Sequence, residues 1–120
     1  MAGLRKGGIN SFTVQEAQNV ALGQAGSMFN DGTAAMTPPT DHVFVAITFL
    51  TDVTFDDSVG LIAEDPKRYI NTAATANPGG ASGGLAVAAA NAFPKGMTIY
   101  GRWTSINLDS TGTIIAYIGK

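Results

Sequence analysis

The alternation of side chains is clearest in residues 43–50, which read VFVAITFL. In an extended strand, successive side chains point to opposite faces of the sheet. Both faces would be largely apolar here, which is typical of a strand that is covered on both sides. One cover would be the core of the domain, and the other could be a second sheet, the N-terminal segment or a partner chain. The two sets are Val43, Val45, Ile47 and Phe49 on one side, and Phe44, Ala46, Thr48 and Leu50 on the other.

Two further strands are predicted near the end of the chain, in MTIYGRWTSINL (97–108) and TIIAYIG (113–119), which are rich in β-branched and aromatic residues. Asp109–Gly112 lies between them and predicts a hairpin connection. Phe93–Gly96 predicts a type I turn with Pro94 at its second position. With residues 43–50 as their partner, these strands predict an all-β fold, an antiparallel β-sandwich or jelly-roll-like domain.

The first 40 residues are expected to form an N-terminal arm and extended segment, and residues 41–120 the β-sandwich body of a single domain. Thr13 and Glu16 have capping-box spacing and Gly23 follows, so one short helix is predicted over residues 14–22, although a strand also fits. Residues 23–40 show no periodicity and read as extended. An arm that lies along a neighbouring subunit would explain so long a segment.

The middle of the chain gives weaker signals. Residues 61–63 are a short apolar run, and Tyr69 and Ile70 could belong to another strand. The segment TAATANPGGASGG (72–84) is a flexible loop by composition. Residues 85–93 fit either a short buried helix or a strand.

Charge is sparse, at 13% of residues and a net charge of −2, which argues against a nucleic-acid partner because phosphate binding needs a basic surface. A surface poor in charge has few ways to resist association. Part of it is therefore expected to be covered by another chain, and the alternative is a compact monomer with a Ser/Thr/Asn-rich surface.

The sequence predicts a soluble protein with no membrane partner. MAGLRKGG is not followed by an apolar region of the kind found in secretory signals. The longest strongly apolar run has eight residues, too few for a membrane helix. The chain has no cysteine, so it can form neither a disulfide nor a thiolate metal site.

Groups suited to catalysis are few, and we expect no enzyme and no cofactor. The single histidine, His42, directly precedes a predicted strand and reads as a surface residue at the strand edge. No serine lies in a G-x-S-x-G elbow, and the glycines of PGGASGG lack the lysine and the strand–helix context of a phosphate loop.

An acidic cluster lies in and around predicted turns. Aspartate favours turns for conformational reasons alone, and this is the main interpretation. Several carboxylates at a turn could also bind calcium, or supply the acid pair of a glycosidase. No metal is predicted on this basis, and calcium remains an alternative. The cluster consists of Asp52, Asp56, Asp57, Glu64 and Asp65.

Strand periodicity in residues 97–108 separates two kinds of side chain. Tyr100 and Arg102 would share one face, while Trp103 and Ile99 would share the other, with the tryptophan turned toward the core. An exposed Tyr–Arg face suits a protein interface, where both residue types are enriched, and could also suit sugar stacking.

Two stretches carry a resemblance to a known group of proteins. FPKGMTIYGRWTSINLDSTGTIIAYIGK (93–120) and VFVAITFLTDVTFDD (43–57), a little over a third of the chain, resemble small virion structural proteins of tailed bacteriophages, including marine and cyanobacterial phages. The resemblance implies a virion component, most simply a capsid decoration (cement) protein. It would be made in the host cytoplasm and would bind the major capsid protein at the capsid surface as a β-rich homotrimer. The alternative is a head-fibre or tail-associated domain that binds a carbohydrate or receptor.

The candidate residues for capsid or subunit contact come from two regions. In the N-terminal portion they are the basic and aromatic residues Arg5, Lys6, Phe12 and Phe29. In the C-terminal strand they are Tyr100 and Arg102.

Overall fold

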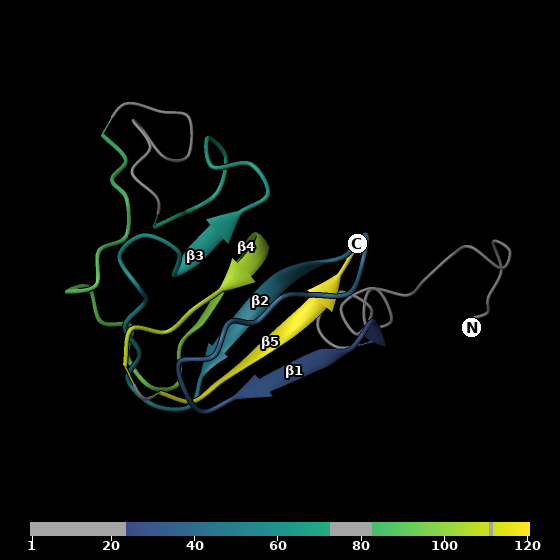
Figure 1. The fold of residues 1–120 in the computed structure, drawn as a ribbon, viewed down its shortest axis with the longest axis horizontal. Helices are drawn as coiled ribbons and strands as arrows, with labels where there is room; N and C mark the ends of the chain where they lie inside the picture. Colours follow the sequence, from purple (N-terminus) through teal and green to yellow (C-terminus); the bar gives the residue numbers. More distant parts are fainter. Residues whose placement is uncertain (1–23, 73–82, 111) are drawn as a thin grey trace, which may run out of the picture.

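The computed structural model describes residues 24–72, 83–110 and 112–120. Five strands form one antiparallel sheet in the order β1-β5-β2-β4-β3 (Figure 1). The all-β fold class is confirmed, and the strands of the described part belong to this single sheet. The strands are β1 (Ser27–Asn30), β2 (Val43–Phe49), β3 (Leu61–Ala63), β4 (Thr98–Ile106) and β5 (Ile114–Gly119).

The centre of the sheet is β2, which pairs with β4 on one edge and with β5 on the other. The predicted hairpin between the last two strands is therefore wrong, because β4 and β5 are not neighbours but run parallel to each other on either side of β2. Their connection is not a tight turn. Leu108 bridges to Phe55, and the amide of Asp109 donates to the carbonyl of Thr54 at 2.9 Å. The connection is thus held by the segment that follows β2, which carries the chain past the end of that strand.

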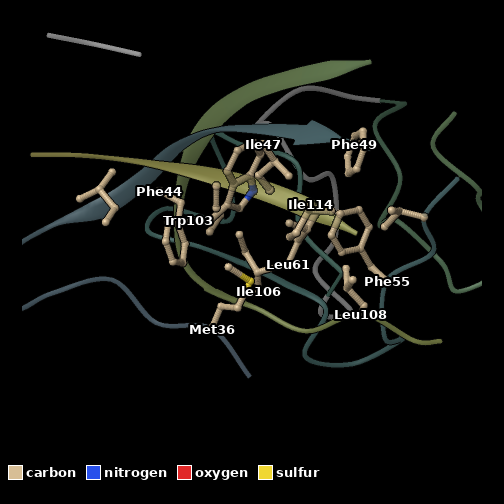
Figure 2. Packing of buried hydrophobic residues seen from close by; sticks show 14 residues of the cluster. Met36, Phe44, Ile47, Phe49, Phe55, Leu61, Trp103, Ile106, Leu108 and Ile114 are labelled. Carbon is tan, nitrogen blue, oxygen red and sulfur yellow. The ribbon is translucent and has the colours of Figure 1, made fainter. Parts of the chain in front are cut away.

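One face of the sheet, the inner face, carries the hydrophobic core (Figure 2). The loop segments after β2 and β4 cover it with apolar side chains, and Phe49, Phe55 and Phe93 meet there with ring centroids 5.3–5.9 Å apart. The buried cluster comprises Met36, Phe44, Ile47, Phe49, Val53, Phe55, Leu61, Ala63, Trp103, Ile106, Leu108, Ile114, Ala116 and Ile118.

A register shift in β2 changes which of its side chains reach the core. The pairing with both neighbours is irregular between Phe44 and Ala46, as a β-bulge would make it. The extra residue brings Phe44 to the same side as Ile47 and Phe49, and all three are buried in the core. Simple alternation placed Phe44 on the opposite side, and that prediction is wrong.

The segment before β2 belongs to the sheet and the core. Residues Ser27–Asn30 form β1, which pairs with β5. Met36 is buried and exchanges two backbone hydrogen bonds with Ile106, of 2.9 and 3.0 Å. Residues 24–36 are thus not a separate extended segment. The predicted helix over residues 14–22 and most of the loop 72–84 lie outside the described residues.

Three local predictions do not hold. Tyr69 lies in a bend and Ile70 in irregular chain, not in a strand. Residues 85–93 form neither a helix nor a strand, and are held by isolated contacts such as the bridge from Phe93 to Val53. The turn after Phe93 begins one residue later than predicted: the amide of Met97 donates to the carbonyl of Pro94 at 3.2 Å, and Gly96 has φ 90°, the geometry of a type II turn.

Candidate interaction surface

The second face of the sheet, the outer face, consists of two rows of side chains across β1, β5, β2 and β4. Residues directly opposite each other in paired strands project to the same side. The alternate residues of β5, Ile114, Ala116 and Ile118, are in the core, so Ile115 and Tyr117 must face outward. The register then gives one row of Phe29, Ile115, Thr48 and Thr98, and a second row of Ser27, Tyr117, Ala46 and Tyr100.

The outer face is aromatic and hydroxyl-rich, and none of its eight residues is charged. Phe29 and Tyr100 stand at its two margins, on β1 and β4, and are 64% and 65% exposed. Ile115 and Tyr117 lie between them and are half-buried. The hydroxyl groups of Thr48 and Thr98 form a hydrogen bond of 2.8 Å across the two strands. Exposed tyrosine and phenylalanine beside hydroxyl groups are typical of protein interfaces.

Arg102 is the charged residue of β4 next to this face. Hydrogen bonds hold its guanidinium group in place. Its Nε donates to Glu64 Oε1 at 2.6 Å and its Nη2 donates to Glu64 Oε2 at 3.3 Å. Its Nη1 donates to the backbone carbonyl of Lys120 at 2.9 Å. The hydrogen bonds with Arg102 lower the pKa of the Glu64 carboxyl, and those with Glu64 raise the pKa of the guanidinium. The ion pair connects β4 to Glu64, just after β3. The hydrogen bond to Lys120 connects β4 to the chain just after β5.

The structure places three of the predicted interface residues on the outer side of the sheet: Phe29 and Tyr100 lie within the two uncharged rows, and Arg102 lies beyond them on β4, paired with Glu64. Phe29 lies on β1, far in sequence from Tyr100 and Arg102 on β4, yet the two exposed rings flank the same four-strand face. Arg5, Lys6 and Phe12 lie outside the described residues. Trp103 is fully buried and faces the core with Ile99, as the alternation predicted.

Several residues of the outer face were not among the contact residues predicted from the sequence, and they include Ile115, Tyr117 and Thr48. The signal for two of them was present, because in IIAYIG every second residue, Ile115 and Tyr117, must share a face. What the pattern could not show is that this face adjoins Phe29, since the pairing of β1 with β5 joins segments about 85 residues apart.

The residues of the acidic cluster lie apart from one another, and most of their carboxylates accept hydrogen bonds from backbone amides. Asp52 accepts from Lys95 at 2.9 Å, Asp57 from Ala89 at 2.6 Å and Asp65 from Lys67 at 3.0 Å. Glu64 instead pairs with Arg102. In the described part of the chain, no three acidic or histidine residues lie close enough together to hold a metal ion. Asp56 and Asp65 therefore form turns, as the main interpretation predicted, whereas Asp52 and Asp57 connect to loop residues 43 and 32 positions away.

Asp56 gives the clearest turn. Its Oδ1 accepts the amides of Val59 at 3.0 Å and Ser58 at 2.9 Å, and the Ser58 hydroxyl at 3.2 Å. These bonds, the two from the backbone amides first, lower the pKa of Asp56 below its ordinary value of 3.8. A group with a lowered pKa in the folded state stabilises the protein above its unfolded pKa, and this contribution is lost as the pH falls through the folded value.

We therefore predict a pH-dependent effect of Asp56→Asn, which keeps the Oδ1 acceptor but removes the charge. The variant should melt below the natural protein at pH 7, and the difference should shrink once the pH falls below 3.8. Thermal melts across this range measure it. Ser58→Ala is the control, because it keeps both backbone bonds and should keep the pH dependence. A gap between Asp56→Asn and the natural protein that stays constant with pH would contradict the assignment.

His42 lies just before β2, partly exposed, with its Nδ1 2.8 Å from the carbonyl oxygen of Thr40. This is the strand-edge position expected from the sequence. Among the described residues, no helix has the length and apolar character needed to cross a membrane.

Comparison with known proteins gives no relative from which a function could be transferred. No family model, no curated protein and no solved structure matches the chain. The function proposed below is inferred from the outer face and from the resemblance of residues 43–57 and 93–120 to phage virion structural proteins.

Proposed function

We propose that the protein is a capsid decoration protein of a tailed bacteriophage, which binds the major capsid protein as a homotrimer and stabilises the shell. The observation that carries the proposal is the uncharged outer face with Phe29 and Tyr100 exposed at its margins. Tyrosine and phenylalanine anchors in a face without charge can be buried against another protein at little desolvation cost. The resemblance to virion structural proteins supports the capsid as the place where this happens.

The rigidity of the body also supports this role. β5 lies inside the sheet, where it pairs with β1 up to Tyr117 and with β2 up to Gly119. The open edge of β3 is satisfied by side chains: Thr72 Oγ1 accepts from the amide of Leu61 at 2.8 Å, and Asn71 Oδ1 accepts from the amide of Ala63 at 2.7 Å. Such blocking protects the edge from unwanted strand pairing and restricts association to other surfaces.

The test is binding to purified capsid shells that lack the protein, with occupancy measured by cryo-electron microscopy and the oligomeric state by light scattering. Deletion of residues 1–12, which removes Arg5, Lys6 and Phe12, should weaken binding while the β body stays folded. Loss of a hot-spot aromatic residue costs about 2 kcal/mol, or about 30-fold in Kd, and we expect at least this loss. Circular dichroism verifies that the shortened protein keeps its strands.

A matched substitution tests the outer face independently of the arm. Tyr100→Ala should also reduce occupancy, whereas Leu85→Ala, at a residue 83% exposed in the loop whose Val87 packs against the core, should leave it unchanged. Equal occupancy by all variants would exclude both contact regions. A protein that ignores shells but binds host glycans on an array would overturn the capsid role in favour of a receptor-binding one.

A further inference from the structure

The two edges of the sheet differ in how their backbone groups are satisfied. β3 forms one edge, where Thr72 and Asn71 accept hydrogen bonds from the amides of Leu61 and Ala63. β1 forms the other edge, beyond β5 (Figure 1). Its outward backbone groups have no such cover from the described part of the chain. Among the described strands, the sheet is therefore open to further pairing on the β1 side.

The register of β1 and β5 identifies the open groups. In an antiparallel pair, residues that exchange hydrogen bonds with the opposite strand alternate with residues whose backbone groups point away from it. The amide of Ile118 donates to the carbonyl of Gly26 at 2.8 Å, so Gly26 and Met28 turn their backbone groups toward β5. The N–H and C=O groups of Ser27 and Phe29 consequently point outward, in the plane of the sheet. No other group of the described residues forms a hydrogen bond with them.

The side chains of β1 leave this edge accessible. Its sequence, SMFN, contains neither a charged residue nor a proline, which are common protections of an exposed strand edge. Phe29 lies on the outer face and is 64% exposed, while Met28 is half-buried and packs against the core. A strand added beside β1 would extend both faces of the sheet. Its side chains would cover Phe29 on the outer side and Met28 on the inner side.

A second copy of the chain does not fit this edge in the proposed homotrimer. Antiparallel pairing of β1 with β1 of another copy has two-fold symmetry and closes a dimer. A three-fold ring would instead require a different edge of the neighbouring copy opposite β1. The other edge of the described sheet belongs to β3, where Asn71 and Thr72 already occupy the backbone amides. The added strand is therefore expected from the protein that the outer face binds.

We infer that an extended segment of the major capsid protein adds to the sheet as a strand beside β1. The inference rests on the proposed function and specifies the part of the capsid protein that is recognised. Main-chain hydrogen bonds to Ser27 and Phe29 would hold the segment, and its alternate side chains would give specificity. The side chain opposite Met28 would be apolar, and those beside Phe29 would be uncharged, in keeping with the outer face.

Ser27→Pro tests the strand addition, with Ser27→Ala as its matched control. Both variants lack the hydroxyl group, but only proline removes the outward N–H and places a ring along the open edge. The fold should accept it, because Ser27 is the first residue of an edge strand and its N–H points away from β5. Binding to purified capsid shells that lack the protein should be at least about tenfold weaker for Ser27→Pro than for Ser27→Ala, since an acceptor of the capsid protein is left unpaired. Sedimentation measures the binding, and circular dichroism verifies that both variants are folded.

The possible outcomes separate the inference from the decoration role. Equal binding by the two variants would overturn the strand addition and leave the decoration role intact, whereas failure of the natural protein to bind shells would overturn both. Light scattering should give both variants the oligomeric state of the natural protein. Dissociation of Ser27→Pro alone would show that β1 pairs between copies, which also overturns the inference.

Cryo-electron microscopy of shells decorated with the natural protein tests the same contact without a substitution. The map should show a strand of the capsid protein beside β1, within hydrogen-bonding distance of Ser27 and Phe29. A strand from a second copy at this position, or solvent, would overturn the inference.

Discussion

Trp103→Ala is expected to destabilise the protein by about 3–5 kcal/mol, the usual cost of deleting a buried aromatic side chain. Trp103 is fully buried on the inner face of β4. Its Nε1 donates to the carbonyl of Ile70 at 2.9 Å. That bond secures the segment whose Asn71 and Thr72 close the edge of β3. The substitution therefore both creates a cavity and loosens the sheet edge. The expected loss is a large part of the total stability of a typical domain, about 5–15 kcal/mol.

Urea denaturation followed by circular dichroism measures this loss. Trp103→Phe should give an intermediate loss, since it keeps most of the ring volume but leaves the Ile70 carbonyl without its donor. Tyr100→Ala is the matched control on the other face of the same strand, where 65% of the side chain is exposed, and should cost far less. Similar losses for Trp103→Ala and Tyr100→Ala would contradict the assignment of the two faces.

The opposite orientation of these two residues shows what strand periodicity can predict. In a regular strand, odd- and even-numbered residues face opposite sides of the sheet, so the faces of Tyr100 and Trp103 could be assigned from the sequence. β2 shows where parity fails. A register shift after Phe44 moves that ring into the core, and nothing in VFVAITFL marks the position of the extra residue.

The order of the strands was not accessible from local pattern. A polar stretch with a glycine between two strand-like runs favours a hairpin, yet β4 and β5 each pair with β2 instead. The reason is tertiary: β2 is largely apolar and can pair on both of its edges, and Leu108 is buried against the segment after β2. Burying Leu108 competes with a tight turn, in which that side chain would be more exposed.

The candidate surface was predictable in part for the same reasons. Turn-forming behaviour of Asp56 and Asp65 depends on neighbours within three residues, so the sequence was sufficient. The outer face depends on β1, a strand of four residues in a segment without periodicity. Phe29 could be named as an aromatic residue of interest, but its place beside Ile115 required the pairing of β1 with β5.

Gly60→Ala is expected to destabilise the protein by about 3 kcal/mol, at the upper end of the cost of overpacking. A Cβ at Gly60 would overlap the carbonyl oxygen of Asp56 and lie 2.6 Å from both the Asp56 nitrogen and the Phe55 Cβ. The site cannot easily relax, because the Gly60 amide donates to Asp56 at 3.0 Å, its carbonyl accepts from Asn107 at 2.8 Å, and Phe55 is fully buried. Gly32→Ala is the matched control: its Cβ would meet no atom within 4 Å, so its effect should stay within about 0.5 kcal/mol. Urea denaturation of both variants measures the difference, and equal stabilities would show that the turn from Asp56 to Gly60 is not packed as tightly as its geometry implies.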